Sequence, residues 1–305
     1  MRKILITGIA GGQGRLLAHR LSSSWQVCGI DRLPWPGAPR NITVHMLDIR
    51  KKRFEDIVRR ERPEAVVHLA FVRHFRTNPR VRHEVNVEGT RRLLEASASV
   101  GIKRLVVLSS ANVYGALPEN PRYVEEDHPL NSSRTFPDIR DMAEVEGLVA
   151  TFLWQYPEIS TSILRAVNTM GPNIRGVVGT YLGFDFVPSV TGFNPMLQFI
   201  HEQDLTEALV LAVESELRGT FNVAGPGAVP LKTAIHAAGR RRLSVPEPLA
   251  HLIISQLFRL RIYRFPPAAI DFLKYPCTVS GRKFERATGF KPAISLEDTL
   301  ASVDR

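Results

Sequence analysis

Residues 3–21 read KILITGIAGGQGRLLAHRL and decide the fold. An apolar, β-branched run leads into a glycine-rich turn and then into the apolar spacing of a helix, which predicts a buried strand, a tight turn and a helix. Gly8 permits the turn, Gly11 lets the backbone approach a pyrophosphate, and Gly14 lets the helix pack closely on the strand. The helix N-terminus then faces the phosphates. The stretch therefore predicts a dinucleotide site; a glycine turn that binds no ligand is the alternative.

The next apolar run, WQVCGID, ends at Asp31, about 20 residues beyond the turn. A carboxylate at this place accepts hydrogen bonds from the adenosine ribose and repels a 2′-phosphate. We therefore expect NAD as the cofactor, with NADP less favoured. Arg32 keeps the second option open, because its guanidinium could pair with a 2′-phosphate or lie over the adenine.

Strand and helix patterns alternate through the first half of the chain. Runs such as AVVHLA and RLVVLSS are short and apolar on both faces, which is typical of strands in a buried parallel sheet. The pattern predicts an α/β fold, a Rossmann-type doubly wound parallel sheet with a smaller C-terminal substrate-binding lobe. We expect residues 1–171 and 199–225 to form the dinucleotide-binding domain, and residues 172–198 and 226–305 to form the lobe.

The 305 residues carry a net charge of +10 in short basic clusters, for example at 51–53 and 240–242. Such clusters predict either solvated helix faces or attraction to anionic partners, and no nucleic-acid motif accompanies them. No run reaches the roughly 18 apolar residues of a membrane span. Cys28 and Cys277 give neither a disulfide framework nor metal-ligand spacing. We therefore expect a cytoplasmic protein without a bound metal.

Further motifs follow in order along nearly the whole chain. The first is TGIAGGQG, which contains Thr7, Gly12 and Gln13 beside the three glycines, and it is followed by LDIR with Asp48 and Ile49. The next are HLAF, from His68 to Phe71, and NVEGT, which begins at Asn86. The last are LSSANVYG, with Ser109, Ser110 and Asn112, and LRAVNTMGP, with Asn168. With these motifs the chain resembles the extended short-chain dehydrogenase/reductase family, also called the NAD-dependent epimerase/dehydratase family. UDP-glucose 4-epimerase is its best-known member.

The resemblance implies a role for each of these residues. Ser110 would be the catalytic hydroxyl that polarises the reacting oxygen, and Asn112 and Asn168 would hold a substrate that resembles a nucleotide sugar. The residues implied in cofactor binding are Thr7, Gly8, Gly11, Gly12, Gln13, Gly14, Asp31, Arg32, Asp48, Ile49, Leu69, Ala70, Phe71, Asn86, Ser109 and Arg140. The resemblance also implies a homodimer formed through the helices near 87–100 and 138–155.

Two histidines have more than one interpretation. His74 lies on the loop after the fourth strand, where the family approaches cofactor and substrate; with Arg73 and Arg76 it could meet an anionic group or belong to a solvated basic loop. His201 could form a catalytic pair with Asp204, although we favour a helix N-terminal role for Asp204.

The stretch NSSRTFPDIRDMAEVEGL, residues 131–148, departs from the family. The family places a tyrosine here and a lysine four residues later, but this chain has Phe136 and Arg140. Phe136 cannot transfer a proton, whereas Arg140 keeps a positive charge and donors that could reach ribose hydroxyls. None of the six tyrosines has a lysine four residues later. No shift of the alignment therefore restores the pair.

Three functions remain open. The chain could be an NAD-dependent oxidoreductase or epimerase that uses another base, for which the candidates are Asp138, Asp141, His128 and Tyr114. It could instead bind the dinucleotide without turnover, as a sensor or scaffold. A third option is a membrane-peripheral dehydrogenase of a lipid or sterol-like alcohol, because residues 246–267 are apolar on one side and carry interspersed arginines. The alternative for this segment is a lobe helix that packs on the substrate cleft.

Overall fold

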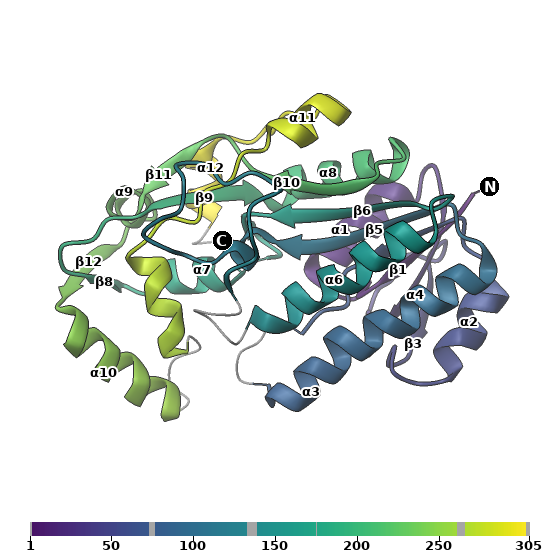
Figure 1. Ribbon diagram of the computed structural model, residues 1–305, viewed down its shortest axis with the longest axis horizontal. Helices are drawn as coiled ribbons and strands as arrows, with labels where there is room; N and C mark the ends of the chain where they lie inside the picture. Colours follow the sequence, from purple (N-terminus) through teal and green to yellow (C-terminus); the bar gives the residue numbers. More distant parts are fainter. Residues whose placement is uncertain (1, 73–76, 133–138, 175, 261–265, 303–305) are drawn as a thin grey trace.

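The computed structural model describes residues 2–72, 77–132, 139–174, 176–260 and 266–302. At its centre lies a seven-stranded parallel sheet in the order β10-β6-β5-β4-β1-β2-β3 (Figure 1). The strands are β1 (Lys3–Thr7), β2 (Gln26–Asp31), β3 (Thr43–Met46), β4 (Ala65–His68), β5 (Arg104–Ser110), β6 (Ser160–Ala166) and β10 (Gly219–Val223). The predicted α/β fold with a doubly wound parallel sheet is confirmed.

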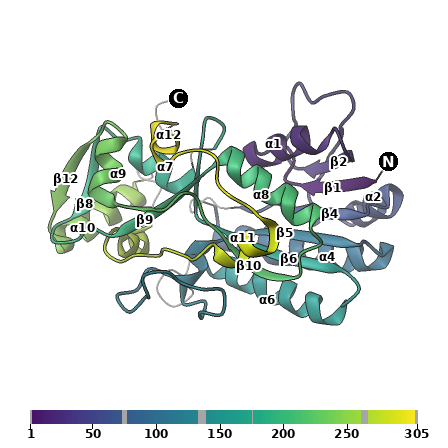
Figure 2. The same ribbon diagram turned by 90° about the horizontal axis from the view of Figure 1, so that it is seen from above.

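Helices cover both faces of this sheet, because its strands are apolar on both sides (Figure 2). In β1, Ile4 and Ile6 belong to one core cluster and Leu5 to the other. One helix layer contains α1 (Gly12–Leu21) and α8 (Glu202–Glu214), which pack against each other; the other contains α2 (Arg53–Glu61), α4 (Gly89–Val100) and α6 (Arg140–Gln155). Each layer therefore buries its own hydrophobic core against the sheet.

Most element boundaries follow local chemistry. α4 ends at Gly101, whose φ of 64° is the left-handed conformation that glycine adopts without strain. The sequence predicts a helix beginning near residue 137, and the described part of it begins at Arg140. Some elements escape prediction. β3 is a partly exposed edge strand without an apolar pattern, and a π-helical turn, η1 (Glu84–Glu88), joins α3 (Pro79–His83) to α4.

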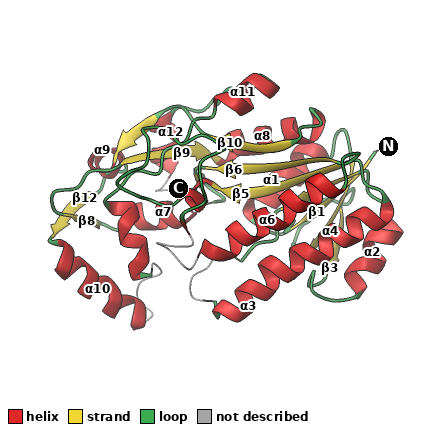
Figure 3. Ribbon diagram, viewed as in Figure 1, coloured by secondary structure: helices red, strands yellow, loops and turns green. Residues whose placement is uncertain are grey.

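A smaller lobe lies beyond one end of the sheet, built from short strands and helices (Figure 3). Its strands form a three-stranded sheet in the order β11-β9-β7 and a two-stranded parallel sheet of β12 and β8. Its elements are β7 (Asn168–Met170), α7 (Gly176–Leu182), β8 (Phe186–Val190), β9 (Met196–His201), β11 (Ala228–Pro230), α9 (Leu231–Ala237), β12 (Arg241–Val245), α10 (Glu247–Arg259), η4 (Pro267–Leu273) and α12 (Leu296–Ala301). Leu182, Phe199 and Leu231 lie in its separate core.

One helix of the segment predicted as lobe lies elsewhere. α11 (Arg282–Thr288) packs against β10 of the large sheet. Phe284 on this helix is fully buried, and its ring meets those of Phe221 and Phe290 at centroid distances of 6.1 and 5.4 Å. This aromatic cluster holds residues 282–290 on the large sheet, to which α8 and β10 also return. The division of the chain into two domains remains a prediction.

Across the described ranges, no helix combines the length and the apolar character needed to cross a membrane.

Candidate functional site

The carboxyl ends of four adjacent strands bring predicted site residues to one edge of the sheet. Thr7 ends β1, Asp31 ends β2, His68 ends β4 and Ser110 ends β5. The chain order also reverses here, since β2 lies on one side of β1 and β4 on the other. In open α/β sheets, ligands bind in the crevice at such a reversal. The tertiary structure therefore brings these four predicted residues to the same edge of the sheet.

The glycine turn at this edge leaves no room for side chains at two positions. Gly8 has a φ of 76°, and a Cβ atom there would lie 2.8 Å from the carbonyl carbon of Leu69. A Cβ atom on Gly14 would lie 2.2 Å from the carbonyl oxygen of Gly8. Gly11 caps α1, and within the described residues no side chain caps this helix. The first amides of α1 are thus open toward an anion, and the N-terminal end of the helix dipole favours one.

A segment from the lobe lies against the first turn of α1. A Cβ atom on Gly12 would lie 2.6 Å from the carbonyl oxygen of Asn173. The Glu202 carboxylate holds Asn173 by accepting from its backbone N–H at 2.9 Å and from its Nδ2 at 2.7 Å. Gln13 donates from Nε2 to Thr206 Oγ1 at 2.8 Å. Sequence reasoning missed Asn173 and Glu202, because this contact forms only when the lobe packs on the sheet.

Asp31 is fixed by two backbone amides. Its Oδ2 accepts from Ala10 N–H at 3.0 Å, and its Oδ1 accepts from Leu33 N–H at 2.9 Å. Each oxygen can accept a second hydrogen bond, so the carboxylate can still meet ribose hydroxyls. Arg32 lies exposed beside it.

Asp48 and Ile49 are engaged by the protein itself. The Arg50 guanidinium donates to both Asp48 oxygens at 2.7–3.1 Å. These hydrogen bonds hold the pKa of Asp48 below its usual range. Ile49 is buried against Gly89, where a Cβ atom would lie 2.4 Å from Ile49 Cδ1. The side chain of Ile49 therefore positions α4, and its predicted adenine contact remains a prediction.

Asn86 fastens the segment after β4. Its Oδ1 accepts from Val72 N–H at 2.8 Å, and its Nδ2 donates to the carbonyl of Val72 at 3.1 Å. This pair holds the partly exposed residues Leu69, Ala70 and Phe71 at the crevice. Asn86 thus acts through the backbone that lines the site.

The His68 ring links the glycine turn to α4. Thr90 Oγ1 donates to the carbonyl of Asn86 at 2.5 Å, so it accepts from His68 Nε2 at 3.0 Å. Thr7 Oγ1 then donates to His68 Nδ1 at 2.6 Å. In a neutral ring, this chain of donors places the proton on Nε2. The hydroxyl of Thr7 therefore points to His68.

The two serines at the end of β5 have different surroundings. Ser110 is partly exposed, and its Oγ accepts from the N–H of Asn112, which is also partly exposed. Ser109 is fully buried, and its hydroxyl donates to Glu146. The Ser109 hydroxyl thus points to α6, and the predicted cofactor contact of Ser109 remains a prediction. Arg140 lies exposed as the first residue of α6, whereas Phe136 and His74 lie outside the described residues.

Two of the four candidate bases are occupied. Tyr114 is fully buried; its hydroxyl donates to Asn222 Oδ1 at 2.8 Å and accepts from Arg165 at 2.6 Å. Burial raises the pKa of Tyr114 to about 12. The Asp141 carboxylate is buried and accepts from Arg82 Nε at 3.1 Å. Neither group is available as a base.

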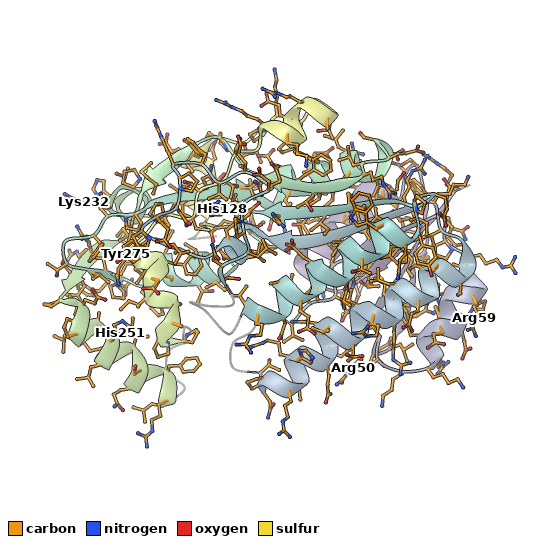
Figure 4. The ribbon with its side chains drawn as sticks, viewed as in Figure 1. Arg50, Arg59, His128, Lys232, His251 and Tyr275 are labelled. Carbon is orange, nitrogen blue, oxygen red and sulfur yellow. The ribbon has the colours of Figure 1, made fainter. Side chains whose placement is uncertain are left out.

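His128 is partly exposed, and its ring centroid lies 6.1 Å from that of Tyr114. Figure 4 shows it close to the carboxyl ends of β5 and β6. No hydrogen bond to its ring is found among the described residues. Asp138 lies outside that part of the chain, so His128 is the described candidate with a free ring.

A buried ion pair joins β6 to α6 next to the carboxyl ends of the strands. Arg165, on β6, donates to the Glu146 carboxylate from Nε at 2.9 Å and from Nη2 at 2.6 Å. The Arg165 Nη1 group also donates to the carbonyl of Glu126, two residues before His128. Sequence reasoning missed this pair, although an arginine inside the apolar strand TSILRAV was a signal, because buried charges need partners.

Three further residues have mainly structural contacts. Asn168 is partly exposed and donates from Nδ2 to the carbonyl of Gln198 at 3.0 Å. His201 caps α8 by accepting from Gln203 N–H. Asp204 lies in the first turn of α8 and accepts from the backbone amides of Ala293 and Ile294 at 2.9 and 3.1 Å. Asp204 thus holds the segment that precedes α12, and its helix N-terminal role remains a prediction, as does the catalytic pair.

Known proteins resemble this chain at the level of sequence and of fold. An uncharacterised protein of Mycobacterium tuberculosis (strain ATCC 25618 / H37Rv) is 33% identical over 207 residues, which cover 65% of this chain and 54% of that protein. The chain thus spans about half the length of its mycobacterial relatives. A 3-diazoavenalumate denitrifying reductase of a Streptomyces species is 29% identical over 267 residues, covering 81% of this chain and 83% of that enzyme.

The structure of Thermus thermophilus UDP-glucose 4-epimerase in complex with NAD superimposes on the structure of this chain with a TM-score of 0.79. It covers 100% of this chain and 98% of the epimerase at 24% sequence identity. This likeness concerns the fold. The sequence model described as the NAD dependent epimerase/dehydratase family matches residues 4–224, which include the glycine turn, Asp31, Ser110 and Asn168. The chain belongs to the NAD-dependent epimerase/dehydratase family.

Proposed function

We propose that this protein binds NAD at the carboxyl edge of the sheet and acts as an oxidoreductase or epimerase on a nucleotide-sugar-like substrate, with an altered proton relay. The steric fit of the glycine turn supports this proposal most. Side chains are excluded at Gly8 and Gly14, and uncapped amides of α1 face the same place. A turn without a ligand would need no such opening to an anion.

The residues that would hold NAD lie along this edge. The amides of Gly12 and Gln13 would bind the pyrophosphate, and the Asp31 carboxylate would accept from the adenosine ribose. Its negative charge favours NAD over NADP. Arg140, exposed at the start of α6, would reach the nicotinamide ribose in place of a lysine. Bound NAD supplies the hydride acceptor.

The altered relay would use Ser110 and His128. The Ser110 hydroxyl is partly exposed at the end of β5 and would polarise the reacting oxygen of the substrate. His128 would accept the hydroxyl proton as hydride leaves the carbon, and would return it in the reverse step. Histidine suits this task because its ordinary pKa lies near neutral pH. The occupied state of Tyr114 and Asp141 supports His128 as the proton carrier.

The substrate class rests on the family and on its solved members. The T. thermophilus protein of the same fold is a UDP-glucose 4-epimerase, and in this proposal Asn112 and Asn168 would hold the nucleotide sugar. The Streptomyces relative is named a reductase of 3-diazoavenalumate. The substrate panel should therefore include 3-diazoavenalumate beside UDP- and GDP-sugars.

Hydride transfer is the test. The purified protein is denatured to measure the NAD that it retains. The native form is then screened with each substrate for growth of the NADH absorbance band and for formation of the epimerised product. We expect stoichiometric NAD and a signal with at least one substrate. His128→Asn should lower that rate by about 10²–10⁴-fold, whereas His19→Asn, a matched change on α1, should leave it unchanged. Equal rates for wild type and His128→Asn would remove His128 from the relay.

The second candidate is a sensor or scaffold that binds NAD without turnover. It is favoured by Phe136 and Arg140, which replace the tyrosine and lysine of the family. Stoichiometric NAD with no hydride transfer from any substrate to NAD would support it. The double variant Phe136→Tyr/Arg140→Lys separates the two: a gain in turnover would mean that only the relay differs. A dehydrogenase of lipid alcohols stays the third candidate.

We further propose a cytoplasmic homodimer formed through α4 and α6. On α6, Trp154 is 80% exposed, which is unusual for a side chain of this size and supports a partner surface. Sedimentation should give twice the mass of the chain, and Trp154→Glu should give the monomer.

A further inference from the structure

Helix α10 exposes an apolar face to solvent. Leu249, Leu252, Ile253 and Leu260 are 47%, 57%, 40% and 65% exposed. Their spacing of three, four and seven residues places them on one side of the helix. The opposite side, with Ala250 and Ile254, is buried in the core of the lobe. The outward face is therefore not required for folding, and exposed apolar patches of this kind mark interaction sites.

The neighbouring two-stranded sheet continues this surface. Phe186 on β8 and Leu243 on β12 are 59% and 49% exposed. The register pairs Phe186 with Arg241 and Leu243 with Pro188, so both apolar side chains lie on the same face of the sheet. β12 runs into α10 through Pro246, and both lie at the end of the molecule away from the large sheet (Figures 1 and 4, where His251 marks α10).

The charge around this end is positive. Residues 185–190 and 240–260, which contain β8, β12 and α10, hold four Arg but only two acidic residues, Asp185 and Glu247. Arg241 and Arg259 are exposed beside the apolar side chains. The only acidic residue of α10, Glu247, is paired with Lys274 at 2.8 Å.

From these observations we infer that α10 and the β8–β12 sheet form a docking surface for an anionic lipid bilayer. The aliphatic face of α10 enters the interface between headgroups and acyl chains, and the arginines meet the lipid phosphates. Anionic headgroups fit a surface of this sign, whereas a second copy of this chain would bring the same positive charge against it. The inference does not depend on the proposed reaction.

Vesicle co-sedimentation of the full chain tests the inference. We expect binding to vesicles of phosphatidylcholine with phosphatidylglycerol at low salt, at least tenfold weaker binding to pure phosphatidylcholine, and loss of binding at high salt. The variant Leu249→Gln/Leu252→Gln/Ile253→Gln should reduce binding at least tenfold. The matched control, Leu33→Gln/Met46→Gln, changes exposed apolar residues of the large domain and should bind as the wild type does.

Circular dichroism and thermal melting establish that each variant is folded. Failure of the wild type to bind anionic vesicles at low salt would overturn the inference, as would equal binding by the wild type and the α10 variant. Sedimentation velocity adds a second readout. If the α10 substitutions dissociate a dimer of the wild type while vesicle binding is absent, the surface is an interface between two copies of the chain and the bilayer proposal fails.

Discussion

Glu146 on α6 and Arg165 on β6 form a buried ion pair directly behind the strand that ends at Ser110. Their closest atoms, Glu146 Oε2 and Arg165 Nη2, are 2.6 Å apart, and the side chains are only 3% and 7% exposed. The pair also holds the hydroxyls of Ser109 and Tyr114. One charged contact thus fixes α6 to β6, and the hydroxyl of Ser109 ties the same pair to β5.

Breaking this pair should be costly. Glu146→Gln leaves the Arg165 guanidinium buried without its counter-charge, and we expect the free energy of unfolding to fall by about 3–5 kcal/mol. Urea denaturation measures this loss. The double variant Glu146→Gln/Arg165→Met removes both charges and should recover a large part of it. If the double variant is as unstable as the single one, charge pairing is not what stabilises the site.

The Tyr114 hydroxyl should matter for stability and not for proton transfer. Tyr114→Phe leaves Asn222 and Arg165 without one hydrogen bond each, so we expect a loss of about 1–3 kcal/mol in the free energy of unfolding. The pKa of Tyr114 is raised to about 12, so this hydroxyl does not titrate between about pH 6 and 10, a range that also lies above the ordinary pKa values of carboxylates. The pH profile of any turnover in this range should therefore have the same shape in Tyr114→Phe as in the wild type. A profile that loses one limb in this variant would restore Tyr114 as a candidate base.

Glycine is required at position 14 but not at position 147. The Cβ atom of Gly14→Ala would overlap the carbonyl oxygen of Gly8, so we expect a loss of about 1–3 kcal/mol in stability and much weaker NAD binding. Gly147 lies on α6, and a Cβ atom there would meet nothing within 4 Å; Gly147→Ala should stabilise the protein by about 0.5–1 kcal/mol. Thermal melting and calorimetric titration with NAD check both. Normal NAD binding by Gly14→Ala would refute the role of this turn.

Low pH should reduce the contribution of the Asp48–Arg50 contact to the free energy of unfolding. Hydrogen bonds from Arg50 lower the pKa of Asp48 in the folded state, so the unfolded chain binds protons more readily. The stability from this contact is present above the ordinary carboxylate pKa of about 3.9 and is lost as pH falls through the lower folded value. Arg50→Met should therefore flatten the decline of urea midpoints below about pH 5. Arg59→Met, which changes an exposed arginine of α2, should leave the decline as it is.

Cys28 should be unreactive in the folded protein. It is buried in β2, and burial raises the pKa of its thiol to about 12, so almost no thiolate exists near neutral pH. In the Cys277→Ser variant, a thiol reagent at about pH 8, slightly below the ordinary thiol pKa of about 8.5, should modify Cys28 only as the chain unfolds in urea. Labelling at the rate of a free thiol would show that β2 opens readily.

Local chemistry made much of the fold predictable. The turn after β1 needs glycine within a few residues, and the apolar runs of β1, β4 and β5 specify buried strands by themselves. The same holds for the carboxyl-edge position of Asp31 and Ser110, because both follow such runs directly. β3 and η1 were not predictable, since an exposed edge strand and a single π-helical turn leave little pattern in the sequence.

The partners of the site residues could not be read from the motifs. Asp48 and Ser109 match positions of a cofactor site, yet Arg50 and Glu146 engage their side chains. Asn173 reaches Gly12 from far along the chain, and Phe284 brings α11 back to the large sheet. Most of these contacts join residues that are distant in sequence, and their existence depends on how the layers pack.

By itself, the sequence determined the strand–turn–helix unit, the alternating α/β order and the replacement of the relay pair by Phe136 and Arg140, because these are properties of short segments. The tertiary structure alone decided that Tyr114 and Asp141 are occupied, that His128 is left free among the described candidates, and that α10 turns an apolar face outward. Hydrogen bonding and burial depend on which side chains meet in space, and only packing of the sheet, the helix layers and the lobe determines that.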